Sequence, residues 1–215
     1  MITRLTVGPL AANCWIYSAG DGSAFVIDPG DDAEVIISAL KKAGLSARYI
    51  LLTHGHFDHI AAVPRLKEAF SPEAVIAIHR LDAEYLGPGS YENHRESARS
   101  AMGSDSIIDA YWPVFKEGLP PADILLEDGD TIGAFTVLSL PGHTPGSAAF
   151  WDREQRVIFT GDTLFKGGFG RTDLKGGDEE EIYKSLKRLS AMDGDIKVCP
   201  GHGGATTIAK ELSDY

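Results

Sequence analysis

The stretch Tyr49–His59, with the sequence YILLTHGHFDH, joins an apolar run to a loop that is dense in metal-binding side chains. The potential ligands in this loop are His54, His56, Asp58 and His59. In an extended loop, side chains at positions i, i+2 and i+4 point the same way, so the first three can converge while His59 faces the other side. One loop can therefore serve two ions. Imidazole and carboxylate ligands without cysteine suit zinc, iron or manganese.

Three further ligand candidates occur downstream. His143 and His202 each follow a strand-like run in a repeated Pro-Gly-His phrase, and Asp162 follows the apolar run 157–161. Together with the loop, five histidines and two aspartates could supply three histidines to one ion, two histidines and an aspartate to the other, and one shared aspartate. So many polar groups packed together would be costly to bury without a metal.

The order of these ligands, HxHxDH followed by a distant His, Asp and His, resembles the pattern of the metallo-β-lactamase superfamily, in the order used by its glyoxalase II branch. The resemblance covers almost the whole chain. The segment Phe165–Leu174, FKGGFGRTDL, is similar to the loop after the bridging aspartate in short, bacterial-type glyoxalase II-like proteins. What the resemblance implies is an α/β fold in four layers, the αββα metallo-β-lactamase sandwich.

The resemblance also implies a site for two divalent metal ions, with zinc as the first expectation and iron or manganese as alternatives. The implied ligands are His54, His56 and His143 for the first ion, Asp58, His59 and His202 for the second, and Asp162 as the bridge. Arg171 matches a basic position of the branch and would hold a substrate carboxylate; a solvent-facing arginine is the alternative.

The activity implied is hydrolysis of a thioester such as S-D-lactoylglutathione. Two cations carry four positive charges, two aspartates remove two and a bridging hydroxide removes one, so the cluster stays net positive. A metal lowers the pKa of bound water from about 15.7 to about 7, which makes the metal-bridging hydroxide available as the nucleophile. Asp58 would aim this hydroxide, and the metals would stabilise the oxyanion. A small-molecule thioester is therefore the expected partner.

Other activities share this sequence pattern. A persulfide dioxygenase looks alike, uses one iron and by resemblance would bind it with His54, His143 and Asp162. A lactonase of the same superfamily is the third candidate, and a non-catalytic binding protein with this fold is the remaining class. The number of bound metal ions separates the dioxygenase from the hydrolase, and any metal-dependent turnover excludes the binding protein.

Length and composition suit one domain that spans residues 1–215. The 31 acidic and 20 basic residues give a net charge of -11, which opposes binding to nucleic-acid phosphates. No stretch approaches the ~20 apolar residues of a membrane span, and the N-terminus lacks a basic segment followed by an apolar one. We therefore expect a cytoplasmic protein without nucleic-acid or membrane partners, whose oligomeric state the sequence does not indicate. Cys14 and Cys199 are expected to be buried thiols rather than a disulfide.

Apolar patterning predicts alternating strands and helices. The expected strands are 2–7, 13–18, 23–28, 49–53, 75–78, 131–139, 147–151, 156–160 and, last in the chain, 196–199, with the second and third forming a hairpin. A helix capped by Asp31 or Asp32 and stopped by Gly44 is expected to bury Val35, Ile36, Ala39 and Leu40. A second helix, at 179–191, is expected to bury Ile182, Leu186 and Leu189.

Residues 87–120 are predicted to form a helical insertion. Its apolar residues at helical spacing are Ile107, Ile108, Tyr111 and Phe115, which favours packing on the body, with a lid over the metals as the alternative.

Three polar residues fall outside the ligand pattern. His79 and His94 lack ligand-like company and are expected not to bind metal. Asp28 ends a strand-like run and could orient a ligand histidine, or it could serve only as a turn former in its Asp-Pro-Gly phrase.

Overall fold

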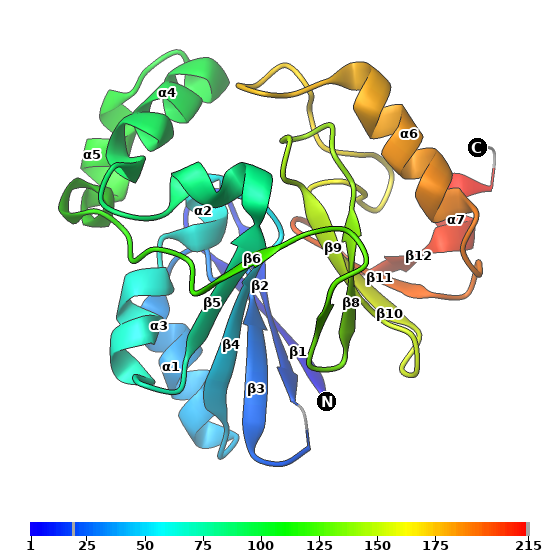
Figure 1. Cartoon of the computed structure of the whole chain (residues 1–215), viewed down its shortest axis with the longest axis horizontal. Helices are drawn as coiled ribbons and strands as arrows, with labels where there is room; N and C mark the ends of the chain where they lie inside the picture. Colours follow the sequence, from blue (N-terminus) through cyan, green and yellow to red (C-terminus); the bar gives the residue numbers. More distant parts are fainter. Residues whose placement is uncertain (19, 214–215) are drawn as a thin grey trace.

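The computed structural model describes residues 1–18 and 20–213, and it shows two six-stranded sheets packed face to face between helices (Figure 1). The first sheet has the strand order β1-β2-β3-β4-β5-β6, and the second has the order β12-β11-β10-β9-β8-β7. Helices α1 and α3 lie on the outer face of the first sheet, while α6 and α7 lie outside the second. This arrangement is the α/β, four-layer αββα sandwich that the resemblance implied.

The elements have the following bounds. The first sheet consists of β1 (Ile2–Val7), β2 (Ala12–Ser18), β3 (Ser23–Ile27), β4 (Ser46–Leu52), β5 (Val75–His79) and β6 (Ile124–Leu126). The second consists of β7 (Thr131–Ile132), β8 (Phe135–Ser139), β9 (Ala148–Asp152), β10 (Val157–Gly161), β11 (Lys197–Pro200) and β12 (Thr206–Thr207). The α-helices are α1 (Ala33–Lys42), α2 (Phe57–Ile60), α3 (Val63–Ala69), α4 (Ser90–Met102), α5 (Ser106–Tyr111), α6 (Glu179–Ser190) and α7 (Ile208–Leu212). Two 3₁₀ helices complete the set, η1 (Arg80–Tyr85) and η2 (Pro113–Glu117).

Alternation along the strands builds three apolar layers between the four structural ones. On β4, Ile50 and Leu52 face the helices, whereas Leu51 faces the second sheet, as expected for successive residues of a strand. The layer between the sheets is aromatic, and Phe25 and Phe135 meet edge to face with ring centroids 5.0 Å apart. A third apolar layer joins α6 and α7 to the second sheet. These layers fix the ends of the strands relative to one another.

The carboxyl ends of the central strands gather the site residues. Strands β3, β4 and β5 run parallel, as do β10 and β11, so each group ends at one edge of its sheet. Asp28 directly follows β3, and the loop that starts at Thr53 directly follows β4. Asp162 directly follows β10, and the phrase that contains His202 follows β11. Open α/β sheets commonly bind ligands at this edge.

Several predictions of local structure are corrected by the fold. The predicted strand 131–139 is two strands, β7 and β8, because Gly133 adopts a φ of +58° and turns the chain between them. Strand β11 is not the last, since β12 follows it. Strand β6 and helices α2 and α3 had not been predicted from the sequence. These unexpected elements are short, so their hydrophobic periodicity spans too few residues to be read.

Helix α1 buries a face rotated from the predicted one. Ile36, Ile37 and Leu40 are buried, whereas Val35 is 54% exposed. Asp32 occupies the N-cap position but makes no side-chain hydrogen bond to the helix; its Oδ2 instead accepts from the backbone N–H of Gly8 at 2.9 Å. Helix α6, by contrast, buries the three apolar residues that were predicted.

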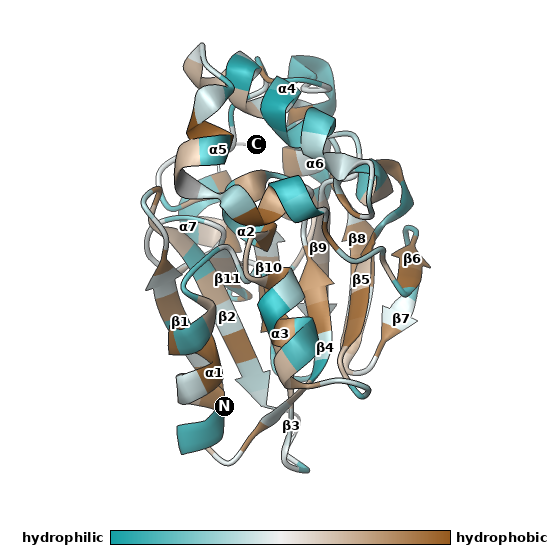
Figure 2. Ribbon diagram, turned by 90° about the vertical axis from the view of Figure 1, so that its left-hand side faces the viewer, coloured by the Kyte–Doolittle hydropathy of each residue, from teal (hydrophilic) through white to brown (hydrophobic). Residues whose placement is uncertain are grey.

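The segment between β5 and β6 is largely helical, with η1, α4, α5 and η2 in succession. Ile108 and Phe115 are fully buried in the layer on the helical side of the first sheet, and Ile107 packs against it. The side chain of Tyr111 lies outside the described part of the structure. Helix α4 carries mostly hydrophilic residues (Figure 2) and lies above the ends of the sheets in Figure 1.

Two further expectations bear on the chain as a whole. Cys14 and Cys199 are both buried free thiols, as predicted. Among the described residues, no helix combines the length and the apolar character that crossing a membrane requires.

Candidate metal centre

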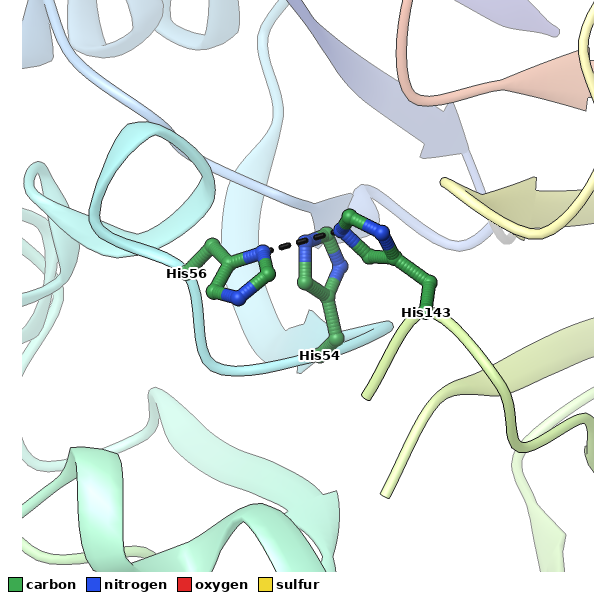
Figure 3. Close-up of side chains that lie close together, drawn as sticks. All are labelled: His54, His56 and His143. Atoms are coloured by element: carbon green, nitrogen blue, oxygen red, sulfur yellow. Dashed lines mark hydrogen bonds between the residues drawn. The ribbon is translucent and has the colours of Figure 1, made fainter. Parts of the chain in front are cut away.

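The first predicted ligand set comes together from two different sheets. His54 and His56 lie in the loop after β4, and His143 lies between β8 and β9 (Figure 3). One ligand nitrogen from each of the three lies within 4.8 Å of the others. The closest pair is His56 Nδ1 and His143 Nε2, 2.9 Å apart. All three side chains are buried. This geometry allows the three imidazoles to converge on one ion.

The second predicted set, Asp58, His59 and His202, gathers beside the first and meets the same 4.8 Å limit. The two Nε2 atoms of His59 and His202 are 3.2 Å apart. Asp58 Oδ2 lies 3.4 Å from His202 Nε2 and 3.6 Å from His59 Nε2. Asp58 and His59 belong to the short helix α2 and not to an extended loop. The helix brings both side chains into the same ligand set, whereas an extended loop would point neighbouring side chains in opposite directions.

Asp162 faces both ligand sets. Its Oδ1 lies 3.5 Å from His59 Nε2, and its Oδ2 lies 3.6 Å from both His143 Nε2 and His202 Nε2. Close backbone approach makes this possible, because a Cβ atom on Gly201 would lie 2.1 Å from Asp162 Oδ1. The carboxylate therefore occupies the position from which it can bridge two ions.

The side chains fit metal ions because three of their polar atoms are buried without a hydrogen bond to any residue that the structure describes. His54 Nε2, His56 Nε2 and Asp162 Oδ1 are buried and make no hydrogen bond within the described chain. Leaving such atoms unsatisfied costs free energy, which coordination would recover. Burial lowers the pKa of His54 and of His56 well below the usual value. Both rings are therefore neutral, which is the form that binds metal.

Comparison with known proteins identifies the family that the ligand pattern indicated. A sequence model of the metallo-beta-lactamase superfamily matches residues 7–202. The chain belongs to the metallo-beta-lactamase superfamily. Hydroxyacylglutathione hydrolase GloC of Haemophilus influenzae is 38% identical over 98% of this chain and 94% of that protein. The sequence-based recognition of the superfamily and of its glyoxalase II-like branch is thereby confirmed.

Two solved structures of this superfamily's fold cover nearly the full chain. The BLEG-1 B3 metallo-beta-lactamase is 33% identical, with a TM-score of 0.83 over 99% of this chain and 97% of that one. TTHA1623 in a di-iron-bound form is 37% identical, with a TM-score of 0.79 over 97% and 96% of the two chains. The protein thus belongs to a superfamily of metallo-hydrolases, and its clustered histidines and aspartates form groups that could hold metal ions.

Carboxylates dominate the electrostatics of the second set. Burial opposes a charge on His59, yet the nearby Asp162 and Asp58 outweigh it and raise the pKa of His59. Burial likewise opposes ionisation of Asp58, but His59 and His202 hold the pKa of its carboxyl below the usual range. The same negative field that favours a proton here also favours a divalent cation.

Asp28 supports the second set from behind. Its Oδ2 lies 3.2 Å from His59 Nδ1 and accepts a hydrogen bond from the Thr53 hydroxyl at 2.6 Å, and its Oδ1 accepts one from the backbone N–H of Thr53 at 2.8 Å. Asp28 adopts a left-handed φ of +51°, so the backbone turns at the point where the side chain enters the site. It can therefore act both as a turn former and as the group that orients His59.

The two remaining histidines, His79 and His94, belong to none of the groups of potential ligands found among the described residues, which are the two predicted sets and a third formed by Asp28, His54 and His59. His79 Nε2 lies 2.9 Å from the Ser139 hydroxyl, and its Nδ1 accepts from the N–H of Leu81. His94 is buried against Phe115, and its Nε2 lies 2.8 Å from the carbonyl oxygen of Tyr85. Burial lowers the pKa of His94 to about 4, so this ring is neutral.

A cleft of about 460 Å³ opens over the ligands. Apart from the ligand residues and Arg171, its walls are mainly apolar. The large apolar residues in them are Leu10, Phe57, Met102, Phe165, Phe169 and Leu174. Ser97, Ala101 and Met102 come from α4, so the 87–120 segment both packs on the body and forms one wall of the cleft. Leu10 and Met102 could not be predicted as cleft residues, because a single exposed apolar residue is common on any protein surface.

Arg171 lines this cleft, but its guanidinium already has a partner. Nε and Nη2 bind the two carboxylate oxygens of Asp173 at 2.7 and 2.8 Å, and Nη1 donates to the carbonyl of Ala101 at 3.3 Å. The carbonyl of Arg171 lies 2.7 Å from His143 Nδ1 and can fix the orientation of that ring. The residue thus connects a ligand histidine to α4.

Proposed function

We propose that the protein is a dinuclear metal-dependent thioesterase that acts on substrates such as S-D-lactoylglutathione. The observation that carries the proposal is the placement of two complete three-residue ligand sets on either side of Asp162, at the floor of an open cleft. The GloC relative supports the thioester part, since it is named a hydroxyacylglutathione hydrolase. We propose zinc as the metal, with iron or manganese as alternatives that bind the same ligand types.

In the proposed mechanism, different residues hold the metal ions, orient the attacking oxygen and surround the substrate. When bound, a pair of divalent ions supplies Lewis acidity and lowers the pKa of water from about 15.7 to about 7. Asp58 belongs to the second ligand set and also lines the cleft. Its carboxylate could therefore accept a hydrogen bond from the attacking water or hydroxide and orient that oxygen toward the carbonyl carbon of the substrate. The apolar walls would reduce the contact of a bound substrate with water.

The walls of the cleft define where a substrate would lie. Met102 and Phe169 are 37% and 38% exposed and can cover the aliphatic parts of the acyl or thiol arm. Arg171 would hold a substrate carboxylate in place of Asp173. The Arg171 and Asp173 side chains are 49% and 68% exposed, so solvent weakens their attraction and a substrate carboxylate can compete for the guanidinium.

The competing activity is persulfide dioxygenation with one iron, which would use His54, His143 and Asp162. The convergence of Asp58, His59 and His202 on a second position favours the hydrolase, since the dioxygenase would have no use for that set.

The proposal is tested by removing metals with a chelator and reloading separate samples with zinc, iron or manganese. Each sample is assayed for hydrolysis of S-D-lactoylglutathione and for oxygen consumption with glutathione persulfide. We expect thioester hydrolysis that depends on added metal, without oxygen consumption. Oxygen uptake by the iron-loaded sample, with no thioester hydrolysis by any sample, would overturn the proposal in favour of the dioxygenase.

A further inference from the structure

A buried aspartate, Asp82, lies close to the first ligand set but belongs to neither set. Its side chain is 0% exposed and sits in η1, directly after β5. Three donors surround its carboxylate. Oδ2 accepts from the backbone N–H of Gly55 and from the hydroxyl of Thr144, each at 2.8 Å, and Oδ1 accepts from the backbone N–H of Gly146 at 2.7 Å.

These donors come from the two loops that carry the first ligand set. Gly55 lies between His54 and His56 in the loop after β4, and Thr144 directly follows His143 in the loop between β8 and β9. The two loops extend from different sheets. One carboxylate therefore joins the two halves of the sandwich at the point where three imidazoles must converge.

The surroundings of Asp82 are built for this contact. A Cβ atom on Gly146 would lie 2.4 Å from Asp82 Oδ1, so only glycine lets the loop come this close. A Cβ atom on Gly55 would lie 2.2 Å from the ring of Tyr85, which places the ligand loop directly against η1. Thr144 is held in turn by Ser147, whose Oγ accepts from the Thr144 N–H at 3.0 Å. Hydrogen bonds to an ionised group are about twice as strong as neutral ones.

We propose that Asp82 is a positioning residue that sets the affinity of the first metal position by fixing the His54–His56 loop relative to His143. It would do so without touching a ligand side chain. Asp28 plays a comparable part for the second set, through His59. The inference rests on the metal centre of the proposed function and not on the identity of the substrate.

The test uses Asp82→Asn, which keeps the shape but turns one acceptor oxygen into an NH2 group. Because each oxygen of Asp82 receives a backbone N–H, that group must face a donor whichever way the amide lies. Zinc affinity is measured by competition with a chromophoric chelator, and NMR of the histidine rings identifies which rings are metal-bound. We expect the affinity of the His54, His56 and His143 position to fall about 10–100-fold, the usual effect of losing a group that supports a ligand, while the second position changes by less than about 3-fold.

Asp152→Asn is the matched control. Asp152 is also buried and also accepts hydrogen bonds from a hydroxyl and a backbone N–H, those of Tyr17 and Gln155, but neither donor belongs to a loop that carries a metal ligand. A purely structural role for Asp82 predicts that both variants lose thermal stability and that neither loses zinc affinity. That result would overturn the proposal, as would equal weakening of both positions in Asp82→Asn.

A milder variant keeps the test decisive if Asp82→Asn does not fold. Thr144→Val removes one of the three donors and retains the volume of the side chain, and we expect a smaller weakening confined to the first position. Unchanged zinc affinity in Thr144→Val would then count against the proposal. The unmodified protein separates this failure from that of the proposed function, since a parent chain that binds zinc at neither position contradicts the metal centre itself.

Discussion

In the proposed mechanism Asp58 has two roles, because its carboxylate belongs to the second set of potential ligands and also lines the cleft. Asp58→Ala should therefore lower the rate of thioester hydrolysis by about 100-fold or more, the order expected when a nucleophile is neither generated nor aimed. The first ligand set is untouched by this change, so one metal should remain. Rates and metal content should be measured on the same sample. A variant that keeps its metals and near-parental activity would contradict the role given to Asp58.

At Gly170 the backbone packs so closely against two of the expected ligands that a side chain would not fit. A Cβ atom there would lie 1.9 Å from the carbonyl oxygen of Asp162 and 3.0 Å from His143 Nδ1. We predict that Gly170→Ala displaces both ligands and lowers metal content and activity together, by about 10-fold or more by analogy with the loss of a ligand's supporting contact. Gly168→Ala is the control, because nothing lies within 4 Å of a Cβ at that position. Equal behaviour of the two variants would show that the close approach at Gly170 is unimportant.

At the scale of elements, the loop 165–174 connects the metal centre to α4. If Arg171 exchanges Asp173 for a substrate carboxylate, Arg171→Ala should raise KM for S-D-lactoylglutathione, leave kcat nearly unchanged and cost ~1.5–3 kcal/mol in kcat/KM. The penalty should disappear with an uncharged thioester.

Asp173→Ala provides the reciprocal measurement, because it removes the internal competitor for the same guanidinium. We expect this variant to lower KM for the anionic thioester and to leave the neutral one unaffected. Equal losses in kcat/KM for charged and neutral substrates in both variants would instead assign the ion pair a role in holding the loop against α4.

The elements show why sequence predicted some features of this protein and missed others. The ligand motif could be recognised in the sequence because metal binding requires particular side chains. The structure brings all seven expected ligands close together, although His143 and His202 are distant in sequence from the HxHxDH loop. Orientation was harder. Val35 and Ile37 are both apolar, and only the packing of α1 on the sheet decides that Ile37 is buried.

The positioning role proposed for Asp82 could not be predicted from the sequence, for a related reason. Its importance comes from two loops that meet it in space, and neither loop is near it in sequence. For residues 87–120 the sequence left packing on the body and a lid over the metals as alternatives, but it did not indicate which residues of α4 would line the cleft, because Ser97 and Ala101 are small residues without a distinctive pattern.

At the scale of the whole molecule, the sandwich brings the edges of two sheets together. The first sheet supplies Asp58, His59 and two further histidines, and the second supplies His143, Asp162 and His202. Neither sheet alone carries a complete set for two ions. The centre can therefore form only when the two sheets are packed together, and bound metal should stabilise the packing of one sheet on the other.

The measurement that tests this account most directly is a titration of metal-free protein with zinc, in which bound ions per chain and the rate of thioester hydrolysis are followed on the same sample. The account predicts saturation at two ions per chain, metal-bound rings for His59 and His202 as well as for the first set, and activity that requires the second ion. Saturation at one ion, with the rings of His59 and His202 still metal-free, would contradict it.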